Sequence, residues 1–252
     1  PVSLSPIVMQ AVALGVEQDK ITTFLLPVQA SNHPIYNPSL DYSVYLSQPF
    51  FFVLFQVLIL LITVYAVGIE IKFRTADEWL FVAKGNMVTA VLGKLLPYTI
   101  IFILIGWLAN YVMFGILHIP FQGSWLLMNM LTALFVVATQ ALGLFLFSLF
   151  PAISLIISIV SMVGSLGATL SGVTFPVTNM YPLVRDASYL FPVRHFTEMM
   201  QNMLYGGSGF IYLWPSVVIL CIFPLLAFVL LPHLKRAIES HKYEKKQYHH
   251  HS

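Results

Sequence analysis

Five long stretches of this chain contain no Asp, Glu, Lys or Arg. They cover about residues 48–68, 95–117, 124–150, 152–172 and 211–232. A helix needs roughly 20 apolar residues to cross the hydrocarbon core of a bilayer, and each stretch is about that long or longer. Only 9% of the residues are charged, against about 25% in a typical soluble domain. The sequence therefore predicts an all-α polytopic membrane protein with five transmembrane helices.

Two features refine these spans. Only Phe150-Pro151 separates the third span from the fourth, which predicts a tight helical hairpin. Pro224 is expected to interrupt the fifth span, and neighbouring groups can satisfy the carbonyl that a proline frees.

The positive charges indicate how the spans are oriented. Nine of the twelve Lys and Arg residues lie in residues 69–94 and in the tail after residue 232. Positively charged loops stay in the cytoplasm, and alternating the five spans places both basic segments there without conflict. The N-terminus is then outside and the C-terminus inside.

This orientation divides the chain into three parts. Residues 1–47 are interpreted as the end of an extracytoplasmic domain or linker, residues 48–232 as the transmembrane domain, and residues 233–252 as a cytoplasmic tail whose closing histidines are typical of a purification tag. An external N-terminus without an export signal needs a span upstream. We therefore expect the chain to be the C-terminal part of a six-span protein.

Several classes of function are excluded by composition and motif. The net charge of +2 is too small to suggest a nucleic-acid partner, and the single cysteine, Cys221, leaves no disulfide framework and no cysteine-based metal site. No Gly-x-x-x-x-Gly-Lys-Ser/Thr phosphate-binding loop is present. Any ATP hydrolysis must therefore take place on another chain.

The segment 69–94 is predicted to contain a short amphipathic helix near the cytoplasmic face. Thr75-Ala76-Asp77-Glu78 fits a capping box, and Gly85-Asn86 can end the helix that follows. Two interpretations remain open: an interfacial anchor with Trp79 at headgroup level, or a docking helix for a cytoplasmic partner.

The fourth span carries a row of small residues, Gly164, Ala168 and Gly172, at successive i+4 steps. Such rows let helix backbones approach closely. The row serves either packing within the bundle or a seam between subunits.

The segment 171–201 mixes prolines with aromatic residues. Apolar side chains such as Phe175, Met180, Phe191 and Phe196 would be poorly placed in water, which favours short re-entrant or interfacial helices buried in protein over an ordinary loop. The segment also carries a cluster of titratable residues. They form either local ion pairs that hold a loop or an external gate for substrate, whose candidate residues are Phe175, Pro176, Met180, Arg185, Arg194 and His195.

Motifs in order along the chain resemble the membrane subunit of type-2 ABC exporters, in the branch of six-span half-size permeases with a large external domain after the first span. The resemblance covers about residues 36–235. Its motifs are Asn37-Pro38 with Tyr42, Glu70 with Thr75 and Asp77, Gly93-Lys94-Leu95-Leu96-Pro97-Tyr98, and Ser171-Gly172 followed by Phe175-Pro176, Met180, Pro182 and Pro192. Lys72 and Arg74 replace an acid and a glycine of the family's coupling motif.

This resemblance implies a homodimer or pseudo-dimer of permeases in the bacterial inner membrane, with two cytoplasmic ATPase subunits that bind ATP and Mg. The chain itself would then need no cofactor. The family's coupling helix would lie in residues 69–94, with the candidate contacts Glu70, Arg74, Thr75, Asp77, Glu78 and Trp79. Gram-negative members often use an external adaptor protein as well. The spans suit an amphipathic or hydrophobic substrate but do not identify it.

Three other functions compete with export. Ion-coupled carriers usually place ionisable residues inside the membrane; these spans have none, although sodium could bind carbonyls and hydroxyls. An intramembrane serine protease needs a base beside its nucleophile, and no His lies inside a span. A membrane scaffold is the third alternative. The polar residues of the spans are expected to hydrogen-bond between helices: Gln56, Thr63, Asn110, Asn129, Thr132, Thr139 and Gln140.

Overall fold

The computed structural model describes residues 42–119, 121, 123–173, 177–206 and 213–239. The Asn37-Pro38 motif and the closing histidines lie outside these ranges. The described residues form helices and the turns between them, with no strand, which confirms the all-α prediction. Its five long helices are α3 (Tyr42–Lys72), α5 (Met87–Asn110, continued by a π-helical turn over Tyr111–Ile116), α6 (Trp125–Leu149), α7 (Ile153–Leu170) and α10 (Trp214–Glu239).

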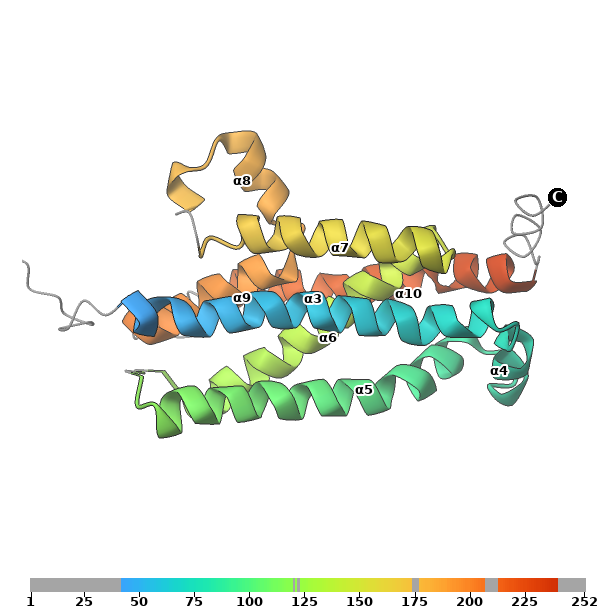
Figure 1. Cartoon of the computed structure of the whole chain (residues 1–252), viewed down its shortest axis with the longest axis horizontal. Helices are drawn as coiled ribbons and strands as arrows, with labels where there is room; N and C mark the ends of the chain where they lie inside the picture. Colours follow the sequence, from blue (N-terminus) through green and yellow to red (C-terminus); the bar gives the residue numbers. More distant parts are fainter. Residues whose placement is uncertain (1–41, 120, 122, 174–176, 207–212, 240–252) are drawn as a thin grey trace, which may run out of the picture. The chain divides into compact units, whose positions relative to one another are not determined.

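These five helices are long and apolar enough to cross a membrane, in agreement with the five predicted spans. Shorter elements connect them: α4 (Ala76–Val82), a 3-10 turn (Val177–Asn179), α8 (Pro182–Ser188), α9 (Pro192–Gln201) and a π-helical turn (Asn202–Gly206). Figure 1 shows α4 at one end of the bundle and α9 at the other.

Three of the long helices, α3, α5 and α10, extend beyond the apolar stretches that predicted them. α3 runs on to Lys72, α5 begins at Met87, and α10 continues through Pro224 and Pro232 to Glu239. The prediction that Pro224 interrupts the fifth span is therefore wrong. A proline removes one backbone hydrogen bond, and packing of an apolar face against neighbouring helices can outweigh that local cost.

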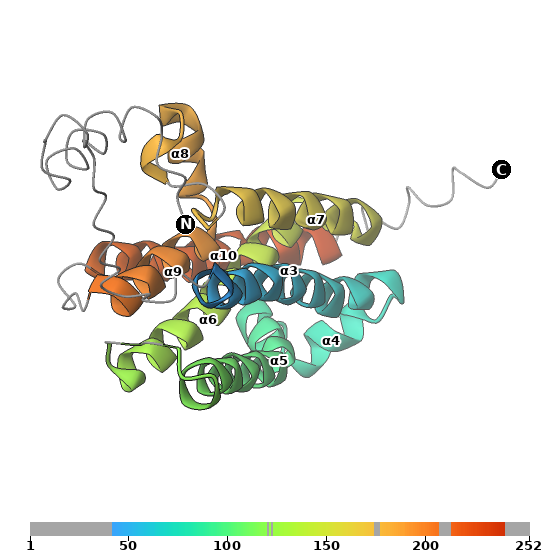
Figure 2. The ribbon, with the colours of Figure 1, turned by 60° about the vertical axis from the view of Figure 1, so that its left-hand side comes forward.

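α6 forms the centre of the bundle. It crosses the other long helices obliquely (Figures 1 and 2) and packs against α10, α3 and α5. In its most apolar stretch 67% of the residues are buried, against 22% in α5 and in α7. A helix enclosed to this degree sets the positions of its neighbours.

The turn between α6 and α7 is as tight as predicted, because only residues 150–152 separate them. The two helices nevertheless make little contact, and α7 packs chiefly on α3 (Figure 1). The hairpin therefore exists in the chain path but not in the packing.

Glycines bring α7 close to α3. A Cβ atom added to Gly164 would lie 3.0 Å from Val57 Cγ2, and one added to Gly167 would lie 2.6 Å from Gln56 Nε2. The predicted row of small residues ends early, because α7 stops at Leu170 and Gly172 lies beyond it with a φ of +86°. Gly164 therefore packs within the bundle, and Gly167, which the row omitted, is the tighter contact.

Polar side chains link α5 to α6, as predicted. Thr99 Oγ1 donates to Gln140 Oε1 at 2.7 Å. Near the other end of α5, Asn110 Nδ2 lies 2.9 Å from Thr132 Oγ1 and 3.2 Å from Asn129 Oδ1. These contacts fix the register of two helices whose apolar surfaces alone would specify it poorly.

Candidate functional site

The two basic segments of the chain meet at one end of the bundle. Lys235 Nζ, near the end of α10, donates to the Gly85 carbonyl between α4 and α5 at 2.7 Å. His233 Nδ1, on the same helix, lies 2.8 Å from the carbonyl oxygen of Ser148 at the end of α6. The ends of α6 and α10 and the α4–α5 turn are thus held together. The side of the membrane on which this end lies stays a prediction.

The chain reverses sharply between α3 and α4. Arg74 has a φ of +60°, and Thr75 is the residue that precedes the first turn of α4. The predicted capping box is wrong, because the Thr75 hydroxyl accepts no backbone N–H of α4 and donates to the Glu70 carboxylate instead. A carboxylate is a stronger acceptor than a neutral oxygen, and the last turn of α3 brings it within reach.

Gly85-Asn86 separates α4 from α5. The amide of Gly85 donates back to the Leu80 carbonyl at 2.9 Å, and the φ of Gly85 is +74°. The Asn86 side chain then accepts from the amide of Val88 at 2.9 Å and caps α5. The predicted end of the helix is therefore confirmed, and Asn86 also begins the next one.

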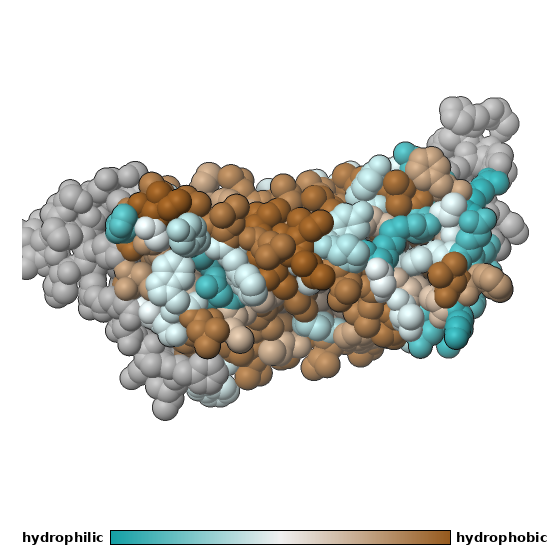
Figure 3. Space-filling view, turned by 90° about the horizontal axis from the view of Figure 1, so that it is seen from below, coloured by the Kyte–Doolittle hydropathy of each residue, from teal (hydrophilic) through white to brown (hydrophobic). Residues whose placement is uncertain are grey.

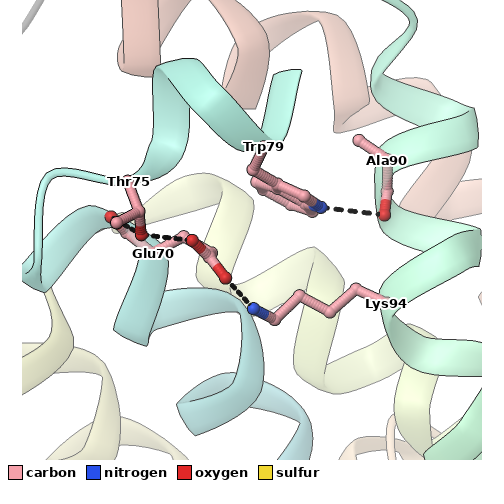
Figure 4. A network of polar contacts seen from close by, with 5 residues as sticks. All are labelled: Glu70, Thr75, Trp79, Ala90 and Lys94. Atoms are coloured by element: carbon pink, nitrogen blue, oxygen red, sulfur yellow. Dashed lines mark hydrogen bonds and ion pairs between the residues drawn. The ribbon is translucent and has the colours of Figure 1, made fainter. Parts of the chain in front are cut away.

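A small polar network holds α4 between α3 and α5 (Figure 4). The Glu70 carboxylate accepts from Thr75 and forms an ion pair with Lys94 on α5. Trp79 Nε1 donates to the Ala90 carbonyl of α5 at 3.1 Å, and Lys94 Nζ lies 5.8 Å from the centre of the Trp79 ring. Three of the predicted site residues, Glu70, Thr75 and Trp79, thus attach α4 to the two long helices α3 and α5.

The opposite face of α4 is exposed. Asp77 and Glu78 lie at the surface, and Phe81 and Val82 are 86% and 81% exposed. Figure 3 shows apolar residues over the middle of the bundle and polar residues gathered toward the end that carries α4. Phe81 and Val82 therefore form an apolar spot at a polar end of the molecule.

The other end of the bundle is built around α9. All but two of its ten residues are buried, and Phe196 packs against Phe52 and Phe135 with ring centres 4.6 Å apart in both pairs. Gln56 Oε1 of α3 accepts from the Val193 amide at 2.8 Å. As predicted, this segment contains short helices, and α9 is buried in protein. α8, by contrast, is largely exposed.

The predicted gate residues form two separate groups. Arg185 lies 3.8 Å from Asp186 on exposed α8, whereas buried Arg194 pairs with Glu198 of α9 at 3.3 Å. His195 is also buried. Met180 is partly buried, and Phe175 and Pro176 lie outside the described residues. The ion pairs are local, and the role of these residues as a gate stays a prediction.

Two residues that the sequence did not single out complete the second group. His195 Nε2 donates to the Tyr189 carbonyl at 3.0 Å, and Ser216 Oγ of α10 donates to Glu198 at 3.2 Å. Burial lowers the pKa of His195, and Arg194 lowers it further, although the Tyr189 carbonyl and Glu198 act in the other direction. His195 is therefore held as a neutral donor. A serine and a tyrosine among many in the sequence carry no local signal of these contacts.

Comparison with known proteins gives a consistent family. Residues 6–231 match the family model described as "ABC-2 family transporter protein". The chain is 31% identical over 109 residues to "Inner membrane transport permease YhhJ" of Escherichia coli (strain K12). The matched region covers 42% of this chain and 28% of the relative. It is 26% identical over 139 residues to "Probable multidrug ABC transporter permease YbhS" of the same strain, covering 54% of this chain and 36% of the relative.

A third relative is matched over a longer region. It is "Probable multidrug ABC transporter permease YbhR" of Escherichia coli (strain K12), with 24% identity over 182 residues, 72% of this chain and 49% of the relative. The chain thus spans less than half the length of each of these relatives. No solved structure matches the chain significantly.

Proposed function

The chain belongs to the ABC-2 family of transporter proteins, and we propose that it is the permease part of an exporter driven by ATPase subunits on separate chains. The family match confirms the resemblance drawn from the motifs. The names of the relatives YhhJ and YbhS, both called permeases, support a transport role. ATP and Mg then belong to the partner ATPases, and this chain contributes the path through the membrane.

The observation that carries the coupling part of the proposal is the attachment of α4. Glu70 belongs to α3, Lys94 and Ala90 belong to α5, and α4 is bonded to both helices through Thr75 and Trp79. A force on α4 would therefore reach two long helices at once. In this mechanism closure of the ATPases pushes α4, and α3 and α5 tilt in response.

The exposed face of α4 suits a protein partner. Phe81 and Val82 offer apolar surface at a polar end of the bundle, and Asp77 and Glu78 lie beside them. An apolar centre with a polar rim is the usual composition of an interface. The positive-inside rule predicts that this end lies in the cytoplasm, where the ATPases would dock.

The remaining features of the proposal follow from the same orientation. Substrate leaves near residues 173–200, at the end of the bundle opposite α4. Two permease copies, or this chain and a paralogue, form the path, and an external adaptor extends it. The surroundings are the bacterial inner membrane, as in the name of YhhJ. The substrate is amphipathic or hydrophobic, which the word "multidrug" in the names of YbhS and YbhR supports.

The test begins with purification of the full-length protein in mild detergent together with its ATPase partners. A complex of two permeases and two ATPase chains is expected. Recovery of the permease without a nucleotide-binding partner would overturn the proposal and favour an ion-coupled carrier or a scaffold.

The second step tests α4. In the reconstituted complex, the double substitution Asp77→Ala with Glu78→Ala and the single substitution Phe81→Ser should each lower transport at least severalfold while ATP is still hydrolysed. Glu239→Ala, which removes an exposed acid at the end of α10, outside both α4 and residues 173–200, is the matched control and should leave transport unchanged. Full transport in both α4 variants would remove this helix from the coupling role.

A further inference from the structure

α5 changes direction near the end of the bundle that carries α4. Figures 1 and 2 both show its first part bent away from the rest of the helix. Pro97 lies inside the helix, ten residues after its first residue, Met87. Proline has no N–H for the Gly93 carbonyl, and its ring crowds that carbonyl, so proline is the usual cause of a sharp bend in a helix. Pro97 therefore divides α5 and its π-helical continuation into two segments, residues 87–96 and residues 97–116.

The first segment is bonded to α4 and α3. The Ala90 carbonyl accepts from Trp79 of α4 at 3.1 Å, and Lys94 forms an ion pair with Glu70 near the end of α3. Toward α6 and α10, by contrast, the segment borders a groove of about 240 Å³. A Cβ atom added to Gly93 would meet no atom within 4 Å. The first segment is therefore held by the α4 end of the molecule and has room to move relative to α6.

The second segment is bonded to α6. Just after the bend, Thr99 Oγ1 lies 2.7 Å from the side-chain oxygen of Gln140. Farther along, a Cβ atom added to Gly106 would lie 2.6 Å from Thr132 Cγ2, so the two helices are in direct contact there. Asn110 also donates to Thr132 Oγ1 at 2.9 Å. The bend thus lies at the boundary between a part of α5 that belongs to the α4 end and a part that belongs to α6.

The lengths of the two segments agree with this division. Met87–Ile116 has 30 residues, which would be about 45 Å long as a straight α-helix. The hydrocarbon core is about 30 Å thick, and residues 97–116 alone would span that distance. Pro97 then lies at the edge of the core, and the first segment, with Lys94, lies in the interfacial region beside α4.

Pro224 of α10 provides a contrast. It also lies inside a long helix, but α10 and α6 share the most extensive contact between helices in the described part of the chain. Buried residues flank Pro224 on both sides, among them Leu220, Phe223 and Ala227. Both sides of Pro224 therefore belong to one packed helix, whereas the two sides of Pro97 have different partners.

We propose that Pro97 is the hinge of α5. When α4 moves, the angle at Pro97 changes: residues 87–96 follow α4, and residues 97–116 keep their place against α6. The hinge rests on the coupling role proposed above for α4, and it confines the movement of α5 to its first segment. Pro97 is thus a positioning residue, because it sets how far a movement of α4 reaches along α5.

Two spin labels on α5 measure the bend directly. They are attached at Val88→Cys in the first segment and Leu108→Cys in the second, both at exposed positions, and Cys221→Ser removes the native thiol. The full-length permease is diluted with unlabelled copies in the complex reconstituted with its ATPases, so that double electron–electron resonance reports distances within one copy. In a straight helix the two positions would be about 30 Å apart. The separation should be shorter than this without nucleotide and should change by about 2 Å when ATP and vanadate trap the ATPases.

A rigid tilt of α5 predicts a different result. If α5 moved as one rod, the separation of its two labels would be the same in both states. The control pair is Met130→Cys with Leu149→Cys on α6, because it spans a similar length of a helix without proline. The separation of this pair should stay constant.

Pro97→Ala separates the hinge from a merely structural role. It restores an N–H donor for the Gly93 carbonyl, so the separation of the α5 labels should lengthen toward that of a straight helix and should no longer respond to ATP. Transport should fall severalfold, whereas the melting temperature should stay the same or rise, because alanine suits a helix interior better than proline. Pro224→Ala is the matched control and should leave the response of α5 intact.

A constant separation of the α5 labels in a complex that transports would overturn the hinge and leave the exporter proposal intact. So would a Pro97→Ala variant that keeps both the response to ATP and full transport. If the permease is recovered without ATPases, the exporter proposal fails, and the permease alone in lipid nanodiscs still tests the bend, because equal separations with and without Pro97→Ala would overturn it. If Pro97→Ala does not fold, the response of the chain with Pro97 in place decides.

Discussion

Gln56, midway along α3, accepts a hydrogen bond at 2.8 Å from the backbone amide of Val193 at the start of α9. The residue that precedes α9 is Phe191, whose side chain has no acceptor. An N-terminal helix amide is normally satisfied by a side chain just before the helix. Here a residue 137 positions away in the sequence takes that role, and it ties α9 to the bundle.

Replacing Gln56 with Leu should therefore destabilise the protein. The substitution leaves the Val193 amide buried without an acceptor, at a cost of about 1–3 kcal/mol. The change in stability is measured by thermal unfolding in detergent, monitored through the exposure of buried aromatic residues.

Gln48→Leu is the matched control, about two helical turns earlier on α3. Gln48 is buried, and neither of its side-chain polar atoms has a partner among the described residues. Its replacement should be neutral or stabilising. Equal losses in the two variants would contradict the capping role of Gln56.

Gly167→Ala should also destabilise the protein. The added methyl group would lie 2.6 Å from Gln56 Nε2 and 3.0 Å from the Phe191 ring, so either Gln56 would have to shift from its bond with Val193 or α7 would have to move away from α3. Overpacking of this kind costs about 1–3 kcal/mol. Gly93→Ala on α5 meets no atom within 4 Å and should stabilise the protein by about 0.5–1 kcal/mol. A neutral Gly167→Ala would mean that α7 and α3 are less closely packed than described.

The ion pair of Glu70 and Lys94 predicts a non-additive effect. Both side chains are about four-fifths buried. Glu70→Gln therefore leaves the Lys94 ammonium group incompletely solvated and without its counterion. Each single substitution, Glu70→Gln or Lys94→Met, should cost about 1–2 kcal/mol once the partial exposure is allowed for. The double variant should cost about 1 kcal/mol less than the sum. Strict additivity in denaturation experiments would show that the pair is not formed.

His195 makes stability depend on pH. Its pKa is lowered in the folded protein, chiefly by burial, whereas an unfolded chain binds a proton near pH 6.5. The unfolded state then holds more protons below that pH, so the stability from this group is complete above about pH 6.5 and is lost as the pH falls. The melting temperature should therefore decrease between pH 7 and pH 5.5.

His195→Gln keeps a donor for the Tyr189 carbonyl and does not titrate, so part of this decrease should disappear. His118→Asn, at an exposed position outside α9, is the control variant. A pH profile unchanged by His195→Gln would assign the effect to other groups.

The length of the apolar stretches was enough to predict the five spans, because a helix in lipid must be apolar over a fixed distance. The ends of α3, α5 and α10 were less predictable. Lys72, Lys94 and Lys235 belong to the helices although they are charged, since they lie where a bundle can reach polar partners. An apolar stretch indicates which part of a helix lies in the hydrocarbon core, and the helix can continue beyond that part.

The candidate site was predictable in position but not in detail. Glu70, Thr75, Asp77, Glu78 and Trp79 do gather around α4, because they are neighbours in sequence. The partner of Glu70 is Lys94, and the partner of Trp79 is the Ala90 carbonyl. Both depend on how α4 folds back on α5, which no local pattern encodes. The same holds for Gly167, because whether Gly167 or Ala168 faces α3 depends on the rotation of α7 about its own axis.

The bond from Lys235 to Gly85 gives the bundle a mechanical asymmetry. At the α4 end, polar contacts join α3, α4 and α5 to one another, join α10 to the α4–α5 turn, and join α6 to α10. α7 starts at this same end after a three-residue turn and lies on α3 along small side chains. Four long helices are thus joined by polar contacts at the α4 end, whereas α7 lies against α3 through the close packing at Gly164 and Gly167, so a movement of the α4 end would reach α7 by way of α3.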